Sequence, residues 1–293
     1  MITRSTFLHL RIPFSIFLLP VFLFALSISN NPKIGIVLLV FFIIHFLLYP
    51  ASNGFNSYFD NDEESIGALK NPPKVTDDLY YVSIILDVIA IGLGLIISWQ
   101  FALMLFVYGL VSKAYSHPSI RLKKYAYSSW FVAGFFQGFF TFLTCYIGLN
   151  EFGINDITLI QVLIPAFLIS TLLWGSYPMT QIYQHEEDAK RGDRTLSIVL
   201  GIRGTFHFTA IFFAISITGF VFYYLKYFDR YTAGIFILFL FPVLVYFLLW
   251  YRLARKDESK ADFTNTMRLN LISSVGLSAF FLWLSFRHLF AGI

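Results

Sequence analysis

Charged side chains are scarce in this chain. Asp, Glu, Lys and Arg make up 13% of its 293 residues, about half of the share in a typical soluble domain. Hydrophobic residues make up 57%, and the mean hydropathy is +0.70. So few charges cannot cover a globule of this size with side chains that water solvates. The composition therefore excludes a soluble enzyme and a disordered protein, and it indicates a membrane protein.

Cysteine is almost absent as well. Cys145 is the single cysteine of the chain, so no internal disulfide can form and no metal site can be built on cysteine ligands alone. This excludes a secreted scaffold held by disulfides. The formal net charge is +4, but the basic residues follow the ends of hydrophobic runs instead of forming a patch. We therefore expect no nucleic-acid partner.

Long apolar runs dominate what is present. A membrane-spanning helix needs about 20 mostly apolar residues, because each residue adds about 1.5 Å to a path of about 30 Å. The first run is too long for the apolar core of a signal peptide. Nine runs fit a span, at 12–30, 35–56, 79–98, 100–115, 129–148, 157–182, 205–225, 231–251 and 269–290. We predict an all-α membrane protein with nine transmembrane helices in a single bundle, forming one domain over residues 1–293.

The Lys and Arg residues predict the orientation of this bundle. With nine spans, the loops alternate between the two sides of the membrane, and basic residues favour the cytoplasmic side of short loops. Of the 21 basic residues, only Lys33, Lys226, Arg230 and Arg287 fall on the side opposite the N-terminus. The N-terminus is therefore expected in the cytoplasm and the C-terminus on the opposite side. The expected location is the bacterial cytoplasmic (inner) membrane.

Acidic residues gather on the same predicted cytoplasmic side, where the positive-inside rule gives no reason for them. Eleven of the 17 lie in three clusters, within 60–64, 186–193 and 257–262. The third cluster mixes signs and is typical of a solvated loop. The first two follow the second and sixth predicted spans, so they require another explanation.

The first cluster closes the second span with oxygen-bearing side chains on one helix face. At 100° per residue, Asn56, Asp60 and Glu64 fall on one face together with Asn53. Carboxylates and amide oxygens suit hard divalent cations, and Mg²⁺ commonly combines one or two carboxylates with substrate phosphates. A buried carboxylate is costly without a positive partner. This face therefore predicts a Mg²⁺ site open to the cytoplasm.

The second cluster closes the sixth span in a similar way. Gln184 and Asp188 lie one turn apart, with Glu187 beside them. Two such helix ends on one side of the membrane can hold a metal-bridged diphosphate between them. For either cluster alone, a solvated helix end is an equally good interpretation.

The chain resembles the UbiA superfamily of intramembrane prenyltransferases over nearly its whole length. The segment from Asn56 to Glu64 resembles the family motif Asn-Asp-x-x-Asp-x-x-x-Asp, with Ser57 at its second position. The segment from Gln184 to Leu196 resembles Asp-x-x-x-Asp followed by Gly and Thr-Leu, with Gln184 in place of the first aspartate. Between them, residues 115–123 resemble Tyr-Ser-x-Pro-Pro-x-Arg-Leu-Lys.

The resemblance implies Mg²⁺-dependent transfer of a prenyl group from a polyprenyl diphosphate to a lipophilic, usually aromatic, acceptor within the membrane. The expected metal ligands are Asn56, Asp60, Glu64, Gln184 and Asp188. The expected diphosphate-binding residues are Lys70, Tyr115, Ser116, Arg121, Lys123 and Arg194. Arg191 is expected to help bind the diphosphate or to serve only the topology. Asp60 and Asp188 are the predicted catalytic carboxylates.

Asp87 is the carboxylate that lies well inside a predicted span, which makes it a further catalytic candidate. It can orient or deprotonate the acceptor, or form a structural hydrogen bond with a neighbouring helix. Two other functions stay open at this point. A secondary transporter also carries intramembrane polar residues, although near the bilayer midplane. A catalytically inactive UbiA-like scaffold is the other, because Ser57 and Gln184 depart from the family motifs.

Overall fold

Helices make up all the regular structure of the described chain. The computed structural model describes residues 3–30, 32–150 and 160–291. The helices are α1 (Arg4–His9), η1 (Ile12–Leu18), α2 (Leu19–Ser27), α3 (Ile34–Phe42), η2 (Ile43–Leu48), α4 (Tyr49–Asp60), α5 (Asp78–Ile97), α6 (Trp99–Ser116), η3 (Leu122–Lys124), α7 (Ala126–Gly134), η4 (Phe135–Phe140), α8 (Thr141–Asn150), α9 (Ile160–Ser176), η6 (Tyr177–Thr180), α10 (His185–Lys190), α11 (Leu196–Tyr227), α12 (Arg230–Lys256), η7 (Glu258–Lys260) and α13 (Phe263–Ala291). The predicted all-α class is confirmed.

Eight helical segments of the described residues are long and apolar enough to cross a membrane. They begin at Arg4, Ile34, Asp78, Ala126, Ile160, Leu196, Arg230 and Phe263. The predicted run 100–115 falls in α6, an 18-residue helix that is not among the eight. Residues 157–159 of the predicted sixth run lie outside the described residues. The chain is an integral, multi-pass membrane protein.

Aromatic side chains fill the centre of the bundle, and aliphatic side chains cover much of its outside. The rings of Phe24 and Phe281 stack at 4.5 Å between centroids, and both side chains are fully buried. In contrast, Leu38, Ile96 and Phe241 are each at least 60% exposed. A soluble surface rarely presents so many large apolar side chains together, whereas lipid tails solvate them well. The packing therefore agrees with the hydropathy.

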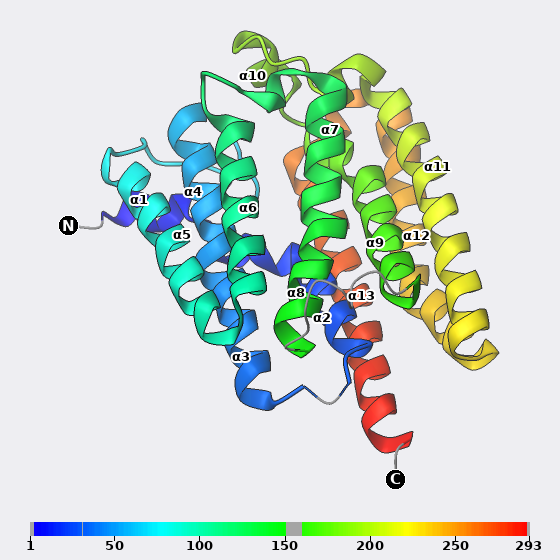
Figure 1. Ribbon diagram of the computed structural model, residues 1–293. Coiled ribbons are helices and arrows are strands. Elements are labelled where there is room, and N and C mark those ends of the chain that lie inside the picture. Colours follow the sequence, from blue (N-terminus) through cyan, green and yellow to red (C-terminus); the bar gives the residue numbers. More distant parts are fainter. Residues whose placement is uncertain (1–2, 31, 151–159, 292–293) are drawn as a thin grey trace.

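The bundle brings the ends of several spans together beneath α10. Figure 1 shows α10 and its neighbouring loops at one end of the bundle, while α13 runs toward the opposite end. At this α10 end, Asn56 of α4 donates a hydrogen bond to Ser116 of α6 over 2.9 Å. Since α6 packs against α5 and ends level with α4, the α5–α6 hairpin returns to the α10 end. This end contains the candidate site.

Candidate active site

A polar cavity of about 150 Å³ lies at the α10 end of the bundle. Four carboxylates line it: Asp60 and Asp62 at the end of α4, and Asp188 and Asp193 in and after α10. Each of these four side chains is less than 10% exposed. The two acidic helix ends that the sequence singles out thus meet in one cavity, at which a common ligand can touch both.

The end of α4 decides which residues of the first motif face this cavity. Asn56 and Asp60 lie one turn apart on α4, and both line it. The helix ends at Asp60 because Asn61 takes a left-handed conformation with φ of 48°, which asparagine tolerates better than most residues. The chain then turns, so Asp62 faces the cavity. Glu64 is 51% exposed instead and lies 3.7 Å from Lys190.

In the second motif, Gly192 turns the chain after α10, as Asn61 does after α4. Gln184 and Asp188 line the cavity as the sequence predicts. After α10, Gly192 has φ of +74°, a conformation that costs a side-chain-bearing residue about 1–2 kcal/mol. This turn lets the backbone N–H of Asp193 donate to the carbonyl oxygen of Asp188 over 2.9 Å. Asp193 is thereby brought beside Asp188 in the same cavity.

Three cationic side chains neutralise this carboxylate cluster. Lys123 forms an ion pair with Asp60. Arg121 donates two hydrogen bonds of 2.9 Å to the two carboxylate oxygens of Asp193. Its guanidinium is also 4.0 Å from Asp60. Both basic residues were predicted to lie at the site, although Arg121 contacts the carboxylates without lining the cavity itself.

The third cation, Arg191, contacts more carboxylates than any other basic residue of the described chain. It pairs with Asp62, donates to Asp188 over 2.7 Å, and lies 3.6 Å from Asp193. Its side chain is 19% exposed. Arg191 therefore links the loop after α4 to the loop that contains α10.

Glu187 strengthens the same link between the two loops. One carboxylate oxygen of Glu187 accepts a hydrogen bond of 2.9 Å from the backbone N–H of Glu63. The carboxylate of Glu187 is not among the groups that line the polar cavity. It acts here as an acceptor for the neighbouring loop, so the geometry gives it no direct place at the metal.

Burial and charge perturb two groups of the cavity. Burial, together with the neighbouring carboxylates of Asp193 and Glu187, raises the pKa of Asp188 to about 7. Burial lowers the pKa of Lys123 to about 8, although Asp193 and Asp188 oppose that shift. A carboxyl group with a raised pKa in a cluster of carboxylates binds added positive charge strongly, whether a proton or a metal ion.

The two amides of the motifs suit a hard metal ion in their orientation. The side-chain nitrogen of Asn56 donates to Ser116, and that of Gln184 donates to the carbonyl oxygen of Ser65 over 3.3 Å. Each amide oxygen is left for another partner. The described residues contain no group of three His, Cys, Asp or Glu side chains that could hold a metal by themselves. Mg²⁺ commonly combines one or two carboxylates with water and substrate phosphates.

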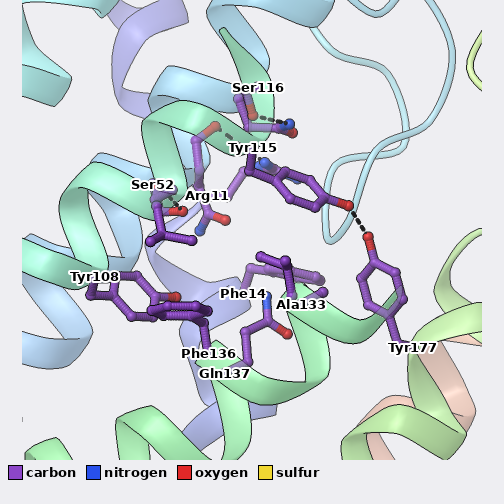
Figure 2. A pocket seen from close by; sticks show the side chains of 15 residues that line it. Arg11, Phe14, Ser52, Tyr108, Tyr115, Ser116, Ala133, Phe136, Gln137 and Tyr177 are labelled. Atoms are coloured by element: carbon purple, nitrogen blue, oxygen red, sulfur yellow. Dashed lines mark hydrogen bonds between the residues drawn. The ribbon is translucent and has the colours of Figure 1, made fainter. Parts of the chain in front are cut away.

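A second cavity, of about 180 Å³, adjoins the polar one on the inner side of the bundle. The two cavities share the lining residues Arg11, Phe14, Asn56, Tyr115 and Tyr177. Figure 2 shows the hydroxyl groups of Tyr115 and Tyr177 joined by a hydrogen bond at one edge of this inner cavity. No carboxylate occurs among its described lining residues. Its lining is apolar and neutral polar, with one cation.

That cation is Arg11, which the sequence suggested only as a topological residue. Its φ of 46° interrupts the first span between α1 and η1. Its guanidinium donates to the carbonyl oxygen of Asn53 over 3.2 Å and lies 5.5 Å from the ring centre of Phe14. The interrupted span thus presents a buried cation to both cavities.

Several predicted site residues lie elsewhere. Lys70 and Glu64 line a separate, wider cavity of about 630 Å³. Arg194 is exposed and lines a cleft near α7. Ser116 lines the inner cavity instead of the polar one. Asp87 lines neither cavity and forms an ion pair with Lys113 of the neighbouring α6.

Comparison with known proteins identifies the family. A model of the UbiA prenyltransferase family matches residues 17–285. The chain belongs to the UbiA prenyltransferase family. No curated protein matches it significantly.

Solved structures with the same fold are distant in sequence. A UbiA homologue from Archaeoglobus fulgidus bound to GPP and Mg²⁺ has a TM-score of 0.68 at 16% identity, covering 96% of this chain and 99% of that chain. An apo UbiA homologue from Aeropyrum pernix K1 has a TM-score of 0.69 at 15% identity, covering 91% and 98%. A structure from a study of digeranylgeranylglyceryl phosphate synthase in membranes has a TM-score of 0.63 at 18% identity, covering 96% and 98%. At these identities the likeness shows the fold alone.

Proposed function

We propose that this UbiA-family protein transfers a prenyl group from a polyprenyl diphosphate to a small lipophilic acceptor, with Mg²⁺ as its cofactor. One observation carries the proposal: Asp60, Asp62, Asp188 and Asp193 line a single polar cavity that adjoins an inner, carboxylate-free cavity. A diphosphate and its metal ions fit the first, and an uncharged or anionic acceptor fits the second. The family membership and the GPP and Mg²⁺ bound by the Archaeoglobus fulgidus homologue support it.

The carboxylates and amides of the polar cavity are the proposed metal ligands. Asn56, Asp60, Gln184 and Asp188 keep the roles predicted from the sequence, and Asp62 takes the place expected for Glu64. When bound, Mg²⁺ neutralises the negative charge that grows on the diphosphate as the allylic C–O bond breaks. Asp193 is the proposed positioning residue for Arg121: it accepts two hydrogen bonds from that guanidinium and so holds it beside Asp60.

Cationic side chains of the cavity bind the diphosphate oxygens in this proposal. Lys123 and Arg191 already face the cavity, and both are mostly buried. Low exposure strengthens their attraction for a phosphate, because little water screens it. Tyr115 adds a hydroxyl donor where the two cavities meet. Lys70 and Arg194, predicted from the sequence, are left out of this group because they line other cavities.

The prenyl tail requires an apolar path away from the diphosphate. A cavity of about 80 Å³ with a mainly apolar lining lies between η1, α9, α11, α12 and α13. Ser176 lines this apolar cavity, and the next residue, Tyr177, lines both the polar and the inner cavity. Leu277 of α13 lines this apolar cavity. We assign the tail to this path.

The proposal includes the membrane topology. We infer nine crossings, with α6 as the fourth, because α6 returns the chain to the level at which Asn56 meets Ser116. The polar cavity then faces the cytoplasm, and residues 1–293 form one domain in the bacterial cytoplasmic membrane. The excess of Lys and Arg on the α10 side supports this orientation.

A turnover assay tests the proposal. Protein purified in detergent receives radiolabelled farnesyl or geranylgeranyl diphosphate, Mg²⁺ and a lipid extract that supplies acceptors. Diphosphate release should depend on the acceptor and stop with a chelator. Asp60→Ala and Asp188→Ala should each lower turnover at least tenfold, equivalent to about 1.4 kcal/mol of transition-state stabilisation. Glu64→Ala is the matched control from the same motif and should change turnover less than threefold.

Other outcomes would favour the two alternatives. Mg²⁺-dependent binding of the prenyl diphosphate without any turnover would identify an inactive scaffold. Uptake of a solute into vesicles without diphosphate release would identify a transporter. The polar cavity lies at the cytoplasmic helix ends and not at the bilayer midplane, which disfavours transport.

Catalysis by Asp87 stays a prediction. Its ion pair with Lys113 supports the structural role that the sequence left open. Asp87→Asn leaves Lys113 as a buried charge without its partner, a change that typically costs about 3–5 kcal/mol. We therefore expect a lower unfolding temperature and a turnover per folded molecule within threefold of the wild type. A large loss of turnover in protein of normal stability would restore the catalytic role.

A further inference from the structure

Two basic residues that the prenyl-transfer site does not use, Lys124 and Arg194, lie together in a cleft of about 290 Å³ on the outside of the protein. The backbone brings them together, because the N–H of Arg194 donates to the carbonyl oxygen of Lys124 over 3.1 Å. Both side chains are exposed. The adjacent Asp193 takes both its hydrogen bonds from Arg121 on the other side of the segment.

The direction of Arg194 follows from its backbone, which forms an isolated parallel β-bridge with Tyr125 and leads into the extended Thr195. Successive side chains of an extended segment point to opposite sides. Asp193 and Thr195 both line the polar cavity, so Arg194 faces away from it, into the cleft. No carboxylate occurs among the described residues that line the cleft. The cleft therefore presents two positive charges without an acidic partner.

The basic residues nearest to Lys124 and Arg194 in the sequence differ from them, because they have acidic partners. Arg121, Lys123, Lys190 and Arg191 each lie within 4.0 Å of at least one carboxylate oxygen. A basic residue at the end of a span is common for topological reasons. Membrane topology does not require that two basic residues share one cleft whose described lining lacks carboxylates. Their combined positive charge suits an anion.

The level of the cleft indicates where this anion comes from. Lys124 stands two residues before the candidate membrane span that begins at Ala126, and the backbone hydrogen bond holds Arg194 beside it. Tyr125 and Tyr127 border the cleft and are 57% and 69% exposed. Exposed tyrosines at the start of a span are typical of the headgroup level of a bilayer. The charges of the cleft thus lie where lipid phosphates lie.

An apolar surface continues from the cleft toward the bilayer interior. Phe131, one turn below Tyr127 on α7, is 50% exposed. The rings of Phe131 and Phe135 stack at 5.8 Å, and those of Phe135 and Phe139 at 5.1 Å. This row of stacked rings exposes its edges as an apolar strip along which an acyl chain can lie.

We propose that the cleft binds the phosphate group of an anionic phospholipid through Lys124 and Arg194, with the acyl chain along the strip of rings on α7 and η4. The site is distinct from the polar cavity, and the proposal does not depend on prenyl transfer. Net negative charge on the lipid is required, because a zwitterionic headgroup carries its own ammonium to neutralise the phosphate. Phosphatidylglycerol is a suitable probe of this chemistry.

Native mass spectrometry of the full chain in mixed micelles tests the proposal. The wild type should retain phosphatidylglycerol in preference to phosphatidylcholine. The double variant Lys124→Gln/Arg194→Gln should bind phosphatidylglycerol about 30-fold more weakly, since each basic residue near anionic lipid contributes about 1 kcal/mol. Lys124→Arg/Arg194→Lys keeps both charges and should retain the lipid within threefold.

A matched control removes the same charge elsewhere. Arg252→Gln/Lys256→Gln changes two exposed residues near the end of α12, outside the cleft, and should alter lipid binding less than threefold. An equal loss in this control would overturn the proposal in favour of diffuse attraction. Unchanged binding in the Lys124/Arg194 double variant would also overturn it. Displacement of the lipid by millimolar inorganic phosphate would instead indicate a site for free anions.

Discussion

The substitution Arg191→Gln separates the role of charge in the polar cavity from the role of shape. Arg191 pairs with Asp62 and Asp188 and lies 3.6 Å from Asp193. Glutamine keeps a polar side chain but removes the positive charge, so the carboxylates are left to repel one another. We expect the variant to be less stable than the wild type when Mg²⁺ is absent, and Mg²⁺ to compensate for much of the loss.

The size of the effect follows from burial. Removing one partner of a buried ion pair typically costs about 3–5 kcal/mol. Arg191 is 19% exposed, so water screens part of its interaction and we take the lower figure, about 3 kcal/mol. For chains of roughly this size, 1 kcal/mol changes the unfolding temperature by about 2–4 °C. The variant should therefore unfold about 6–12 °C below the wild type in a chelator.

Thermal unfolding followed by intrinsic fluorescence measures this directly. Each protein is unfolded in chelator and again in 10 mM Mg²⁺, where a ligand at 100 times its Kd adds about 2.7 kcal/mol of stability. Mg²⁺ should raise the unfolding temperature of Arg191→Gln more than that of the wild type. Arg194→Gln is the matched control, since it removes the same charge from an exposed position outside the polar cavity, and should unfold within about 2 °C of the wild type. Equal unfolding temperatures for Arg191→Gln and the wild type in chelator would refute the reasoning, as would an equal response to Mg²⁺.

Three further predictions concern pH, chain length and packing. Because the pKa of Asp188 is raised to about 7, protons compete with Mg²⁺ for its carboxylate. The apparent Mg²⁺ affinity, measured by calorimetry, should therefore fall about tenfold from pH 8 to pH 6. An affinity that does not change with pH would contradict the assignment of Asp188 as a metal ligand. Leu277→Trp narrows the apolar cavity of about 80 Å³ and should lower turnover of geranylgeranyl diphosphate relative to geranyl diphosphate, so an unchanged ratio would place the tail elsewhere. Gly138→Ala puts a Cβ 2.5 Å from the Cα of Ser170 and should destabilise the protein by about 1–3 kcal/mol. Gly234→Ala, within α12, meets nothing within 4 Å and should leave the unfolding temperature unchanged or raise it by up to about 4 °C, because alanine favours a helix more than glycine does.

Hydropathy alone could predict the all-helical membrane fold. A span requires only a local run of apolar residues, and each of the nine predicted runs lies mainly in helices where the chain is described, apart from a few residues at the ends of the first, third and sixth runs. Eight of the corresponding helical segments are long and apolar enough to cross a membrane, whereas α6, with 18 residues, is long enough but less apolar. Its place in the bundle depends on contacts such as that between Asn56 and Ser116, which no run of hydropathy encodes.

The first motif shows why the site was only partly predictable. Helical periodicity correctly places Asn56 and Asp60 on one face. The same periodicity fails for Glu64, because the helix ends where Asn61 takes a positive φ. Asp62 was visible in the sequence as one of four neighbouring acids, and the pattern gave no reason to prefer it.

What the sequence determined by itself was the all-helical membrane class, the side of the bundle that carries the charge, and the presence of two carboxylate-rich helix ends. These depend on composition over many residues, so single irregular residues do not disturb them. The tertiary structure alone decided that Arg191 faces the carboxylates while Arg194 faces the outer cleft that it shares with Lys124. The physical reason is that beyond a helix end a side chain's direction depends on individual backbone angles, such as the positive φ of Gly192, and on the neighbouring segments that hold them.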